Sequence, residues 1–203
     1  MKVLGIVGSY RKGKVIDTLV SAAVAKAEES GAETEIIYLT DSNIEFCTNC
    51  RACTQKKGKS PTPCWIKDDM NEILAKCEQA DIIILGAPVN FMSLNAVTKK
   101  FMERLLPFTY WPWGRITGPR LRCYTRNRHS ILISSCAMPG ILGRFLTGAM
   151  FSMRVISRLL RARPYRTFVF GFSAVRQKDK ASAGQIESVN KSIERLIRKL
   201  QKN

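Results

Sequence analysis

The cysteines of one short polar stretch are the residues best suited to chemistry. Cys47, Cys50 and Cys53 follow the spacing C-x2-C-x2-C, and Cys64 lies shortly after them. Three thiolates at this spacing can converge on one small cluster, which is typical of cubane iron-sulfur ligation. Zinc sites more often use two separated C-x-x-C pairs. The spacing favours a 4Fe-4S cluster with Cys64 as fourth ligand, and it leaves zinc or redox-active thiols open.

A glycine loop is the second candidate. The residues GSYRKGKV, 8–15, join an apolar run to a helix-period segment, where free amides and the helix dipole favour a phosphate. As a nucleoside-triphosphate loop it fails at Val15, where the magnesium-binding hydroxyl is required. Asp81 stands at the start of its strand rather than at the end. The loop therefore suits a phosphate group, and a P-loop-like nucleotide-binding protein stays open as an alternative.

Apolar runs alternate with helix-period segments along almost the whole chain, which is typical of successive βαβ units. Buried strands are predicted at 2–8, 34–39, 81–87, 130–135 and 167–172. Helices are predicted at 15–30, 69–79, 94–105, 141–161 and 183–201, the second starting at a capping box of Asp69 and Glu72. The pattern predicts a single three-layer α/β domain over 1–203 with a parallel sheet.

Two connections are longer than the usual loop of about 4 to 6 residues. They are the cysteine loop, 40–67, and a basic aromatic insertion, 107–129. The cysteine loop follows the second strand, so it begins at the carboxyl edge of the sheet, where open α/β domains bind ligands. We expect the insertion to cover the flavin or to form a subunit contact.

Three loops resemble the flavin-binding loops of the flavodoxin-like NADPH-dependent FMN reductase family. They read GSYRKGK, GAPVNFMSLNAVTKKFMER and SSCAMPGILGRF, after the first, third and fourth strands. The run CTNCRACT further resembles the iron-sulfur flavoproteins within that family. The resemblance implies a flavodoxin-like sandwich with five parallel strands in the order 2-1-3-4-5, bound FMN and NAD(P)H as co-substrate. In that order the cysteine loop and the phosphate loop share an edge, so the two cofactors are expected to be neighbours.

The resemblance also implies which residues hold the flavin. The phosphate would be held by Ser9, Arg11, Lys12, Gly13 and Lys14. The isoalloxazine ring would be bordered by Pro88, Val89, Asn90 and Phe91, and approached by Ser135, Ala137 and Met138. Because the cofactors carry the chemistry, no side chain is named as a general acid or base.

Positive charge dominates the chain, with a net charge of +17. Residues 99–166 hold fourteen Lys or Arg and one acidic residue, Glu103. Such a surface favours an anionic partner, which could be NADPH, an acidic electron-transfer protein, anionic lipid or nucleic acid. A zinc-stapled nucleic-acid-binding module is therefore a second alternative, although the aromatic residues are not interleaved with basic ones as single-strand binding needs.

The chain opens directly on a strand pattern without a secretory leader, and no apolar stretch is long enough to span a bilayer. We therefore expect a cytoplasmic protein. The resemblance implies a flavin-dependent NAD(P)H oxidoreductase, and we also expect a homo-oligomer. It would transfer electrons from NAD(P)H or a protein donor through FMN and the cluster to an unknown acceptor. His129, the single histidine, has no evident partner for hydrolase chemistry.

Overall fold

The central sheet of the computed structural model, which describes residues 1–173 and 180–202, has the strand order β2-β1-β3-β7-β8. All neighbouring pairs along this order are parallel. The strands are β1 Lys2–Val7, β2 Glu33–Tyr38, β3 Ile82–Asn90, β7 Arg128–Ser135 and β8 Ala162–Phe170. A two-residue strand, β4 Ser93–Leu94, pairs antiparallel with β3. The predicted flavodoxin-like order is confirmed.

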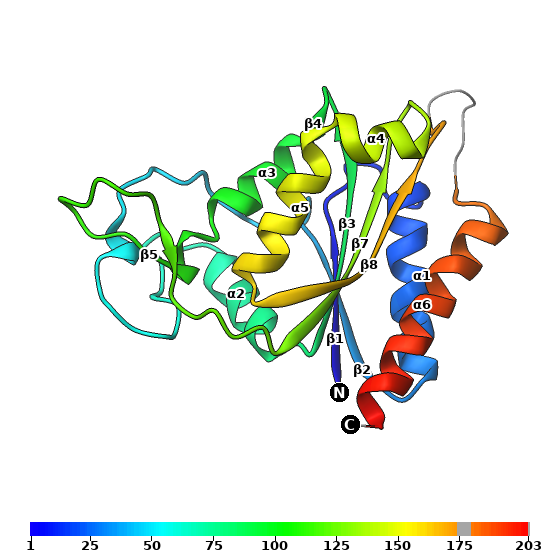
Figure 1. The fold of residues 1–203 in the computed structure, drawn as a ribbon, viewed down its shortest axis with the longest axis horizontal. Coiled ribbons are helices and arrows are strands. Elements are labelled where there is room, and N and C mark those ends of the chain that lie inside the picture. The colour runs from blue at the N-terminus through cyan, green and yellow to red at the C-terminus, as the bar shows by residue number, and fades with distance from the viewer. Residues whose placement is uncertain (174–179, 203) are drawn as a thin grey trace.

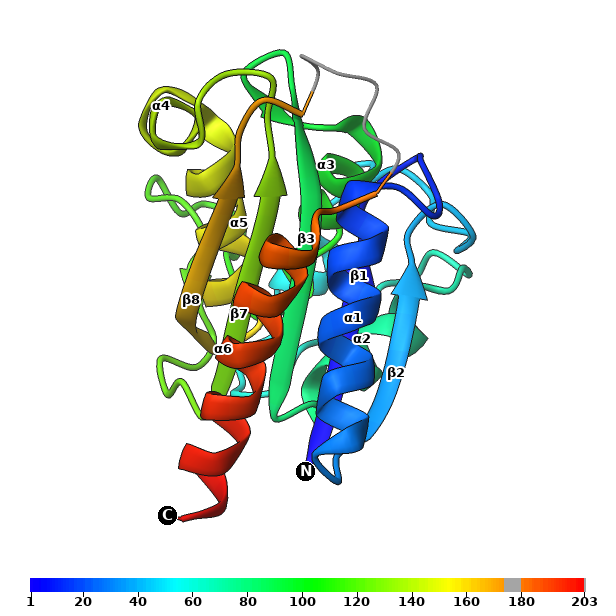
Figure 2. The same cartoon turned by 90° about the vertical axis from the view of Figure 1, so that its right-hand side faces the viewer.

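Helices cover both faces of the sheet, as Figures 1 and 2 show. One face carries α1 Val15–Glu29 and α6 Ala183–Gln201. The other carries α2 Met70–Gln79, α3 Ala96–Glu103 and α5 Gly148–Leu159, while α4 Gly140–Leu146 sits at the carboxyl edge. None of the helices in the described part of the chain is apolar over a length that could cross a membrane.

The sheet separates two hydrophobic cores because successive strand residues point to opposite faces. In β3, Ile82 and Ile84 pack with residues of α1 and α6, whereas Ile83 and Leu85 pack with residues of α2, α3 and α5. All four side chains are buried. Burial on both faces explains why the central strands β1 and β3 are nearly uninterrupted apolar runs, whereas the edge strands β2 and β8 are only partly buried and carry polar residues.

Two predicted helix features differ in the structure. The segment 141–161 forms two helices, because Thr147 is extended and Gly148 N donates to Met92 O at 2.8 Å. This bond ties the start of α5 to the β3–β4 hairpin. Asp69 stands at the N-cap position of α2, but its side chain makes no capping hydrogen bond among the described residues. Its Oδ2 instead accepts a hydrogen bond from Asn43 N at 2.7 Å and so holds the start of the cysteine loop.

The cysteine loop and the insertion lie side by side at one end of the molecule (Figure 1). The loop contains one turn of 3-10 helix, η1 Ala52–Thr54. The insertion is entered through η2 Leu106–Phe108 and carries a small hairpin of β5 Thr109–Tyr110 and β6 Arg120–Leu121. Trp111 N donates to Thr54 O at 3.0 Å. The insertion thus covers the cysteine loop, and none of its residues lines the pocket formed by the predicted flavin loops.

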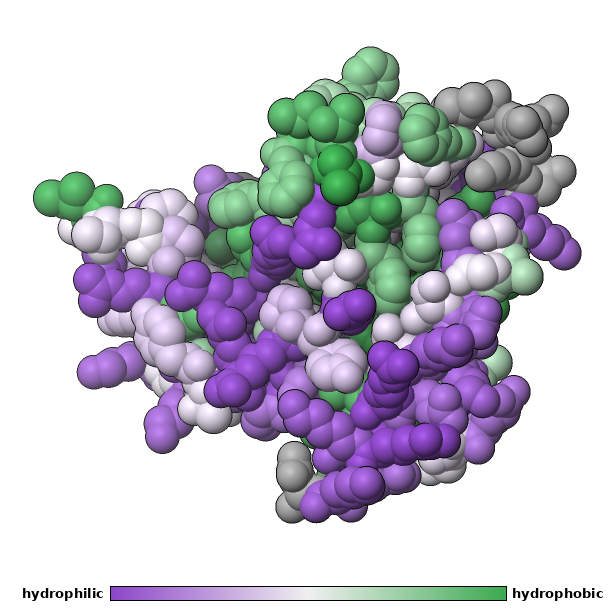
Figure 3. Space-filling model, turned by 45° about the vertical axis from the view of Figure 1, so that its right-hand side comes forward, coloured by the Kyte–Doolittle hydropathy of each residue, from purple (hydrophilic) through white to green (hydrophobic). Residues whose placement is uncertain are grey.

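Exposed hydrophobic side chains gather over α4 and the β3–β4 hairpin, above a broad hydrophilic band (Figure 3). We call them the apolar patch, which consists of Phe91, Met92, Ile141, Leu142, Phe145, Leu146 and Phe151. A contiguous exposed apolar surface of this kind is typical of an interaction site.

Candidate functional site

The three predicted flavin loops meet in one pocket at the carboxyl edge of the sheet. We call it the glycine-loop pocket. It has a volume of about 170 Å³, which suits a phosphate group and leaves the body of a larger ligand on the open rim. The predicted residues that line it are Ser9, Arg11, Lys14, Pro88, Asn90 and Ser135. It is also lined by Tyr10, Val15, Ile16 and Ser173, which the sequence analysis missed.

Four further predicted residues, Val89, Phe91, Ala137 and Met138, belong to the same loops but are not part of the pocket wall. Two others are turned away from it. Lys12 Nζ pairs with Asp41 Oδ2 at 2.5 Å, and Gly13 N donates to Asp17 Oδ2 at 2.6 Å. Asp17 thus occupies an amide that the sequence analysis assigned to the phosphate. The phosphate-binding role predicted for Lys12 and Gly13 has no support in this arrangement.

Gly8 holds the glycine loop against α3. A Cβ atom at Gly8 would lie 2.0 Å from Thr98 Oγ1. Asn95 Nδ2 and Thr98 Oγ1 donate hydrogen bonds to Gly8 O at 2.6 and 3.1 Å, and both side chains are buried. The close approach therefore requires glycine, and it sets the height of the loop above the sheet.

The β3–β4 hairpin forms one rim of the pocket. Asn90 pairs with Ser93, and the two residues between them, Phe91 and Met92, have φ of 45° and 63°. This backbone conformation normally selects Gly or Asn. Strained residues of this kind gather at ligand sites. Phe91 is fully exposed and so presents a free aromatic ring beside the pocket.

The loop after β7 is fixed against the end of β8. A Cβ atom at Gly140 would lie 2.3 Å from Val169 O, so the two backbones are in direct contact. Ser173 N donates to Cys136 O at 3.0 Å, which brings Ser173 into the pocket. Cys136 Sγ donates to Met138 O at 3.2 Å. The thiol of Cys136 is therefore engaged in holding the loop.

The cysteine run turns sharply around Cys50. Asn49 and Arg51, on either side of it, have φ of 53° and 57°. The amide of Ala52 and the indole of Trp65 lower the pKa of the Cys50 thiol, and Trp65 Nε1 lies 3.1 Å from its sulfur. These hydrogen bonds favour the thiolate, which is the form that binds a metal.

The four loop cysteines share one neighbourhood. Burial, together with the nearby Cys64, Cys47 and Cys50, raises the pKa of Cys53 to about 11. Within residues 1–173 and 180–202, no three His, Cys, Asp or Glu side chains stand close enough to hold a single metal ion. A zinc site needs such close ligands, whereas a cubane cluster binds each thiolate at a separate iron and spreads the sulfur atoms wider. The four thiols are thus near one another, but they do not form a ready site for a single ion among the described residues.

Buried donors beside the cysteine run also lack acceptors. The Arg51 guanidinium lies 3.6 Å from the ring centre of Trp111 and 4.1 Å from that of Trp113. Arg51 Nε and Trp111 Nε1 are buried and find no hydrogen-bond partner among the described residues. The sulfur atoms of an iron-sulfur cluster accept such hydrogen bonds. The donor set of the loop is therefore compatible with a cluster.

Arg122, from the insertion, clasps the cysteine loop. Its Nη2 donates to Cys53 O at 2.8 Å and to Thr62 Oγ1 at 3.0 Å, and its Nη1 donates to Lys56 O at 2.6 Å. Its Nε donates to Pro107 O at 2.7 Å. One side chain thus joins both ends of the long spacer between Cys53 and Cys64 to the insertion. The sequence analysis missed this residue because nothing local marks it.

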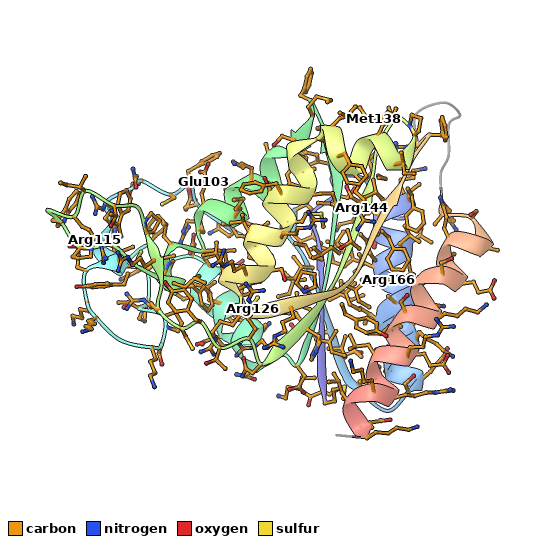
Figure 4. All side chains as sticks on the ribbon, in the orientation of Figure 1. Glu103, Arg115, Arg126, Met138, Arg144 and Arg166 are labelled. Carbon is orange, nitrogen blue, oxygen red and sulfur yellow. The ribbon has the colours of Figure 1, made fainter. Side chains whose placement is uncertain are left out.

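The two candidate sites lie apart. Figure 4 shows Met138 at the carboxyl edge beside α4, whereas Arg115 marks the far end of the insertion that covers the cysteines. In Figure 1 the cysteine loop lies on the outer side of α2 and α3, and the glycine loop lies near the start of α1. The start of the cysteine loop contacts the glycine loop through the Lys12–Asp41 pair, but none of the four loop cysteines lines the glycine-loop pocket.

The P-loop alternative is not supported. Asp81 Oδ2 accepts a hydrogen bond from Lys2 N at 2.8 Å, at the amino edge of the sheet and so opposite the pocket. Val15 lines the pocket where a magnesium-binding hydroxyl would be needed. The fold and the site instead define a flavodoxin-like α/β protein with a pocket at the carboxyl edge of its sheet. The chain belongs to the NADPH-dependent FMN reductase family, whose model matches residues 1–115.

Curated relatives are similar to this chain over about half of its length. An iron-sulfur flavoprotein of Methanocaldococcus jannaschii is 43% identical over 107 residues, which cover 53% of this chain and 53% of the relative. One of Archaeoglobus fulgidus is 35% identical over 112 residues, which cover 55% of this chain and 49% of the relative. The chain thus matches about half the length of these relatives.

Solved structures show the same fold at low identity. An FMN-dependent NADH-azoreductase from Bacillus anthracis, in complex with FMN, has a TM-score of 0.66 and 13% identity, with 98% of each chain covered. A flavone reductase has a TM-score of 0.65 and 18% identity, with 98% of this chain and 62% of that chain covered. At these identities the likeness concerns the fold alone.

Proposed function

We propose that this protein is an FMN-dependent oxidoreductase. It takes electrons from NAD(P)H or a protein donor and passes them through FMN and a 4Fe-4S cluster to an unidentified acceptor. The observation that carries the proposal is the convergence of three separate loops, through Ser9, Asn90 and Ser135, on one pocket at the carboxyl edge. Membership of the NADPH-dependent FMN reductase family supports FMN as the occupant.

The residues of the pocket have distinct tasks in this proposal. Arg11 and Lys14 supply positive charge to the phosphate, and the Ser9 and Ser135 hydroxyls add hydrogen bonds. Pro88 and Asn90 border the ring, with Phe91 exposed at the rim. FMN, when bound, supplies hydride acceptance and one-electron release. The chain itself contributes binding and orientation.

Cys47, Cys50, Cys53 and Cys64 are the ligands that we propose for the cluster. Thiolate-favouring hydrogen bonds at Cys50 and the two buried donors without acceptors support this assignment. The names of the curated relatives support it as well. A 4Fe-4S cluster, when bound, supplies one-electron transfer.

A homo-oligomer remains part of the proposal. The apolar patch beside the glycine-loop pocket is the surface that a second copy would cover. None of the four loop cysteines lines the pocket, so the route that we propose for electrons between the two cofactors is a contact between copies or a separate carrier protein. The basic segment around α5 suits an acidic carrier.

Anaerobic purification with measurement of flavin, iron and acid-labile sulfide tests the proposal. We expect flavin near one per chain after refilling with FMN, and about four irons and four sulfides after reconstitution. Cys50→Ala should abolish iron binding and leave flavin content unchanged, whereas the matched control Cys123→Ala, outside the loop, should change neither. Protein that does not bind FMN would overturn the proposal that it is an FMN-dependent oxidoreductase. Protein that holds FMN and stoichiometric zinc would overturn only the cluster.

A further inference from the structure

A second cavity, distinct from the glycine-loop pocket, lies between α3, α5 and the insertion. Its volume is about 720 Å³. This lies within the range of about 300–1,000 Å³ that is typical of small-molecule sites. Figure 4 places Glu103, one of its lining residues, on α3 at the side of the insertion. No residue lines both this cavity and the glycine-loop pocket.

Helical spacing explains the composition of two of its walls. On α3, Lys99 and Met102 stand at positions i and i+3 and face the cavity, and on α5 Val155 and Leu159 do so at i and i+4. The amphipathic faces of the two helices thus place apolar side chains inside the cavity and long polar ones at its rim. Leu121, from the β6 strand of the insertion, adds a further apolar side chain.

The charges around the cavity are unequal. Lys99, Arg120 and Arg158 line it, each from a different element, against a single carboxylate, that of Glu103. Cations on one solvated helix face need no explanation, but cations from three elements around one apolar cavity focus a positive potential into it. The phenol of Tyr124 also lines it and adds a polar contact.

We propose that this cavity binds a small amphipathic anion, with an apolar or aromatic body among Met102, Val155 and Leu159 and an acidic group held by Arg158 and Arg120. Cys47, a proposed cluster ligand, forms part of the wall. The occupant would therefore lie beside the cluster. Binding itself requires neither FMN nor the cluster, so the proposal fails or stands independently of the proposed function.

The test is a fluorescence titration of the isolated protein with two probes. The anionic probe is 8-anilinonaphthalene-1-sulfonate, and the matched probe without the sulfonate is N-phenyl-1-naphthylamine. We expect one sulfonate site per chain that an excess of FMN does not displace. Arg158→Gln should weaken binding of the sulfonate probe by about fivefold and leave binding of the neutral probe unchanged. Val155→Phe, which fills the cavity, should weaken both probes by about tenfold or more.

Matched controls keep the result specific. Arg154 lies one helical turn before Arg158, is exposed and does not line the cavity. Arg154→Gln should therefore leave the binding of both probes unchanged. Phe145→Ser alters the apolar patch and should also have no effect on the sulfonate site. Circular dichroism confirms that each variant is folded.

Several outcomes would overturn the proposal. They are equal affinity for the two probes, equal losses in Arg154→Gln and Arg158→Gln, or loss of the site in Phe145→Ser. Displacement of the probe as protein concentration rises would assign the cavity to a contact with a second copy and would overturn it as well.

Discussion

The guanidinium of Arg104 and the carboxylate of Asp68 form a buried ion pair that closes the cysteine loop. The two side chains are 1% and 0% exposed, and Arg104 Nη2 donates to Asp68 Oδ1 at 3.0 Å. Asp68 Oδ2 accepts a hydrogen bond from Glu45 N at 2.8 Å, while Arg104 Nη1 donates to Glu45 O at 2.7 Å. The pair therefore joins Glu45, before the first loop cysteine, to Asp68, after the last, at the end of α3.

Removing one partner of this pair should be costly. Arg104→Met leaves the Asp68 carboxylate buried without its cation, so we expect the free energy of unfolding to fall by about 3–5 kcal/mol. Urea denaturation measures it. The control is Lys76→Met, which removes surface pairs to Glu35 and Glu72 and should cost less than about 1 kcal/mol. Equal losses of unfolding free energy in the two variants would show that the buried pair contributes no more to stability than the surface pairs.

The same pair makes stability depend on pH. Burial alone would raise the pKa of Asp68, but the hydrogen bonds from Arg104 and from the amides of Glu45 and Met70 outweigh it and hold the pKa below its usual range. The unfolded state therefore binds a proton more readily, so this contribution to stability is present above about pH 3.9 and is lost as the pH falls further. Asp68→Asn should lose less stability than the wild type on acidification. Parallel pH profiles in denaturation experiments would contradict this assignment.

Arg122 should control the order of the cysteine loop. Arg122→Gln removes its hydrogen bonds to Cys53 O and Lys56 O, so the spacer before Cys64 should open more often. We expect a lysine-specific protease to cleave the spacer about tenfold faster in native protein. Arg126→Gln, at an exposed position of the same insertion, is the control and should behave as the wild type. An unchanged cleavage rate in Arg122→Gln would show that other contacts hold the loop.

Arg11 and Lys12 are adjacent basic residues that the structure separates in role. Arg11 lines the glycine-loop pocket, whereas Lys12 pairs with Asp41. Arg11→Gln should weaken FMN binding by about tenfold, and Lys12→Gln should change it by less than about twofold. Quenching of FMN fluorescence by the apoprotein measures both. The reverse order of effects would mean that the loop rearranges around the phosphate.

Gly8 should tolerate no side chain. Gly8→Ala would place a Cβ atom against the buried Thr98 hydroxyl, so we expect a loss of about 1–3 kcal/mol in the free energy of unfolding together with weaker FMN binding. Gly118→Ala, which has open space around it, should stay within about 0.5 kcal/mol of the wild type. Thermal denaturation with and without FMN distinguishes the two variants, and a neutral Gly8→Ala would show that the loop is free to shift.

Local patterns in the sequence determined most of the fold. The apolar runs predicted all five strands of the main sheet, because each strand holds apolar side chains that face the two cores. The α6 helix has its predicted bounds, 183–201, since the helical period and the capping box of Ser182 and Gln185 are both local. The cysteine spacing and the glycine loop could be recognised in the sequence because they too are local patterns.

Only the tertiary structure decided how the loops are used. Asp17 takes the amide of Gly13, and Thr147 interrupts the predicted helix at the place where Gly148 N reaches Met92 O. Arg122 reaches Cys53 across 69 positions of the chain, so no local pattern could reveal the contact. The separation of the two candidate sites has the same origin, because the path of a long loop depends on hydrogen bonds between distant segments, whereas periodicity reports only which face of an element is buried.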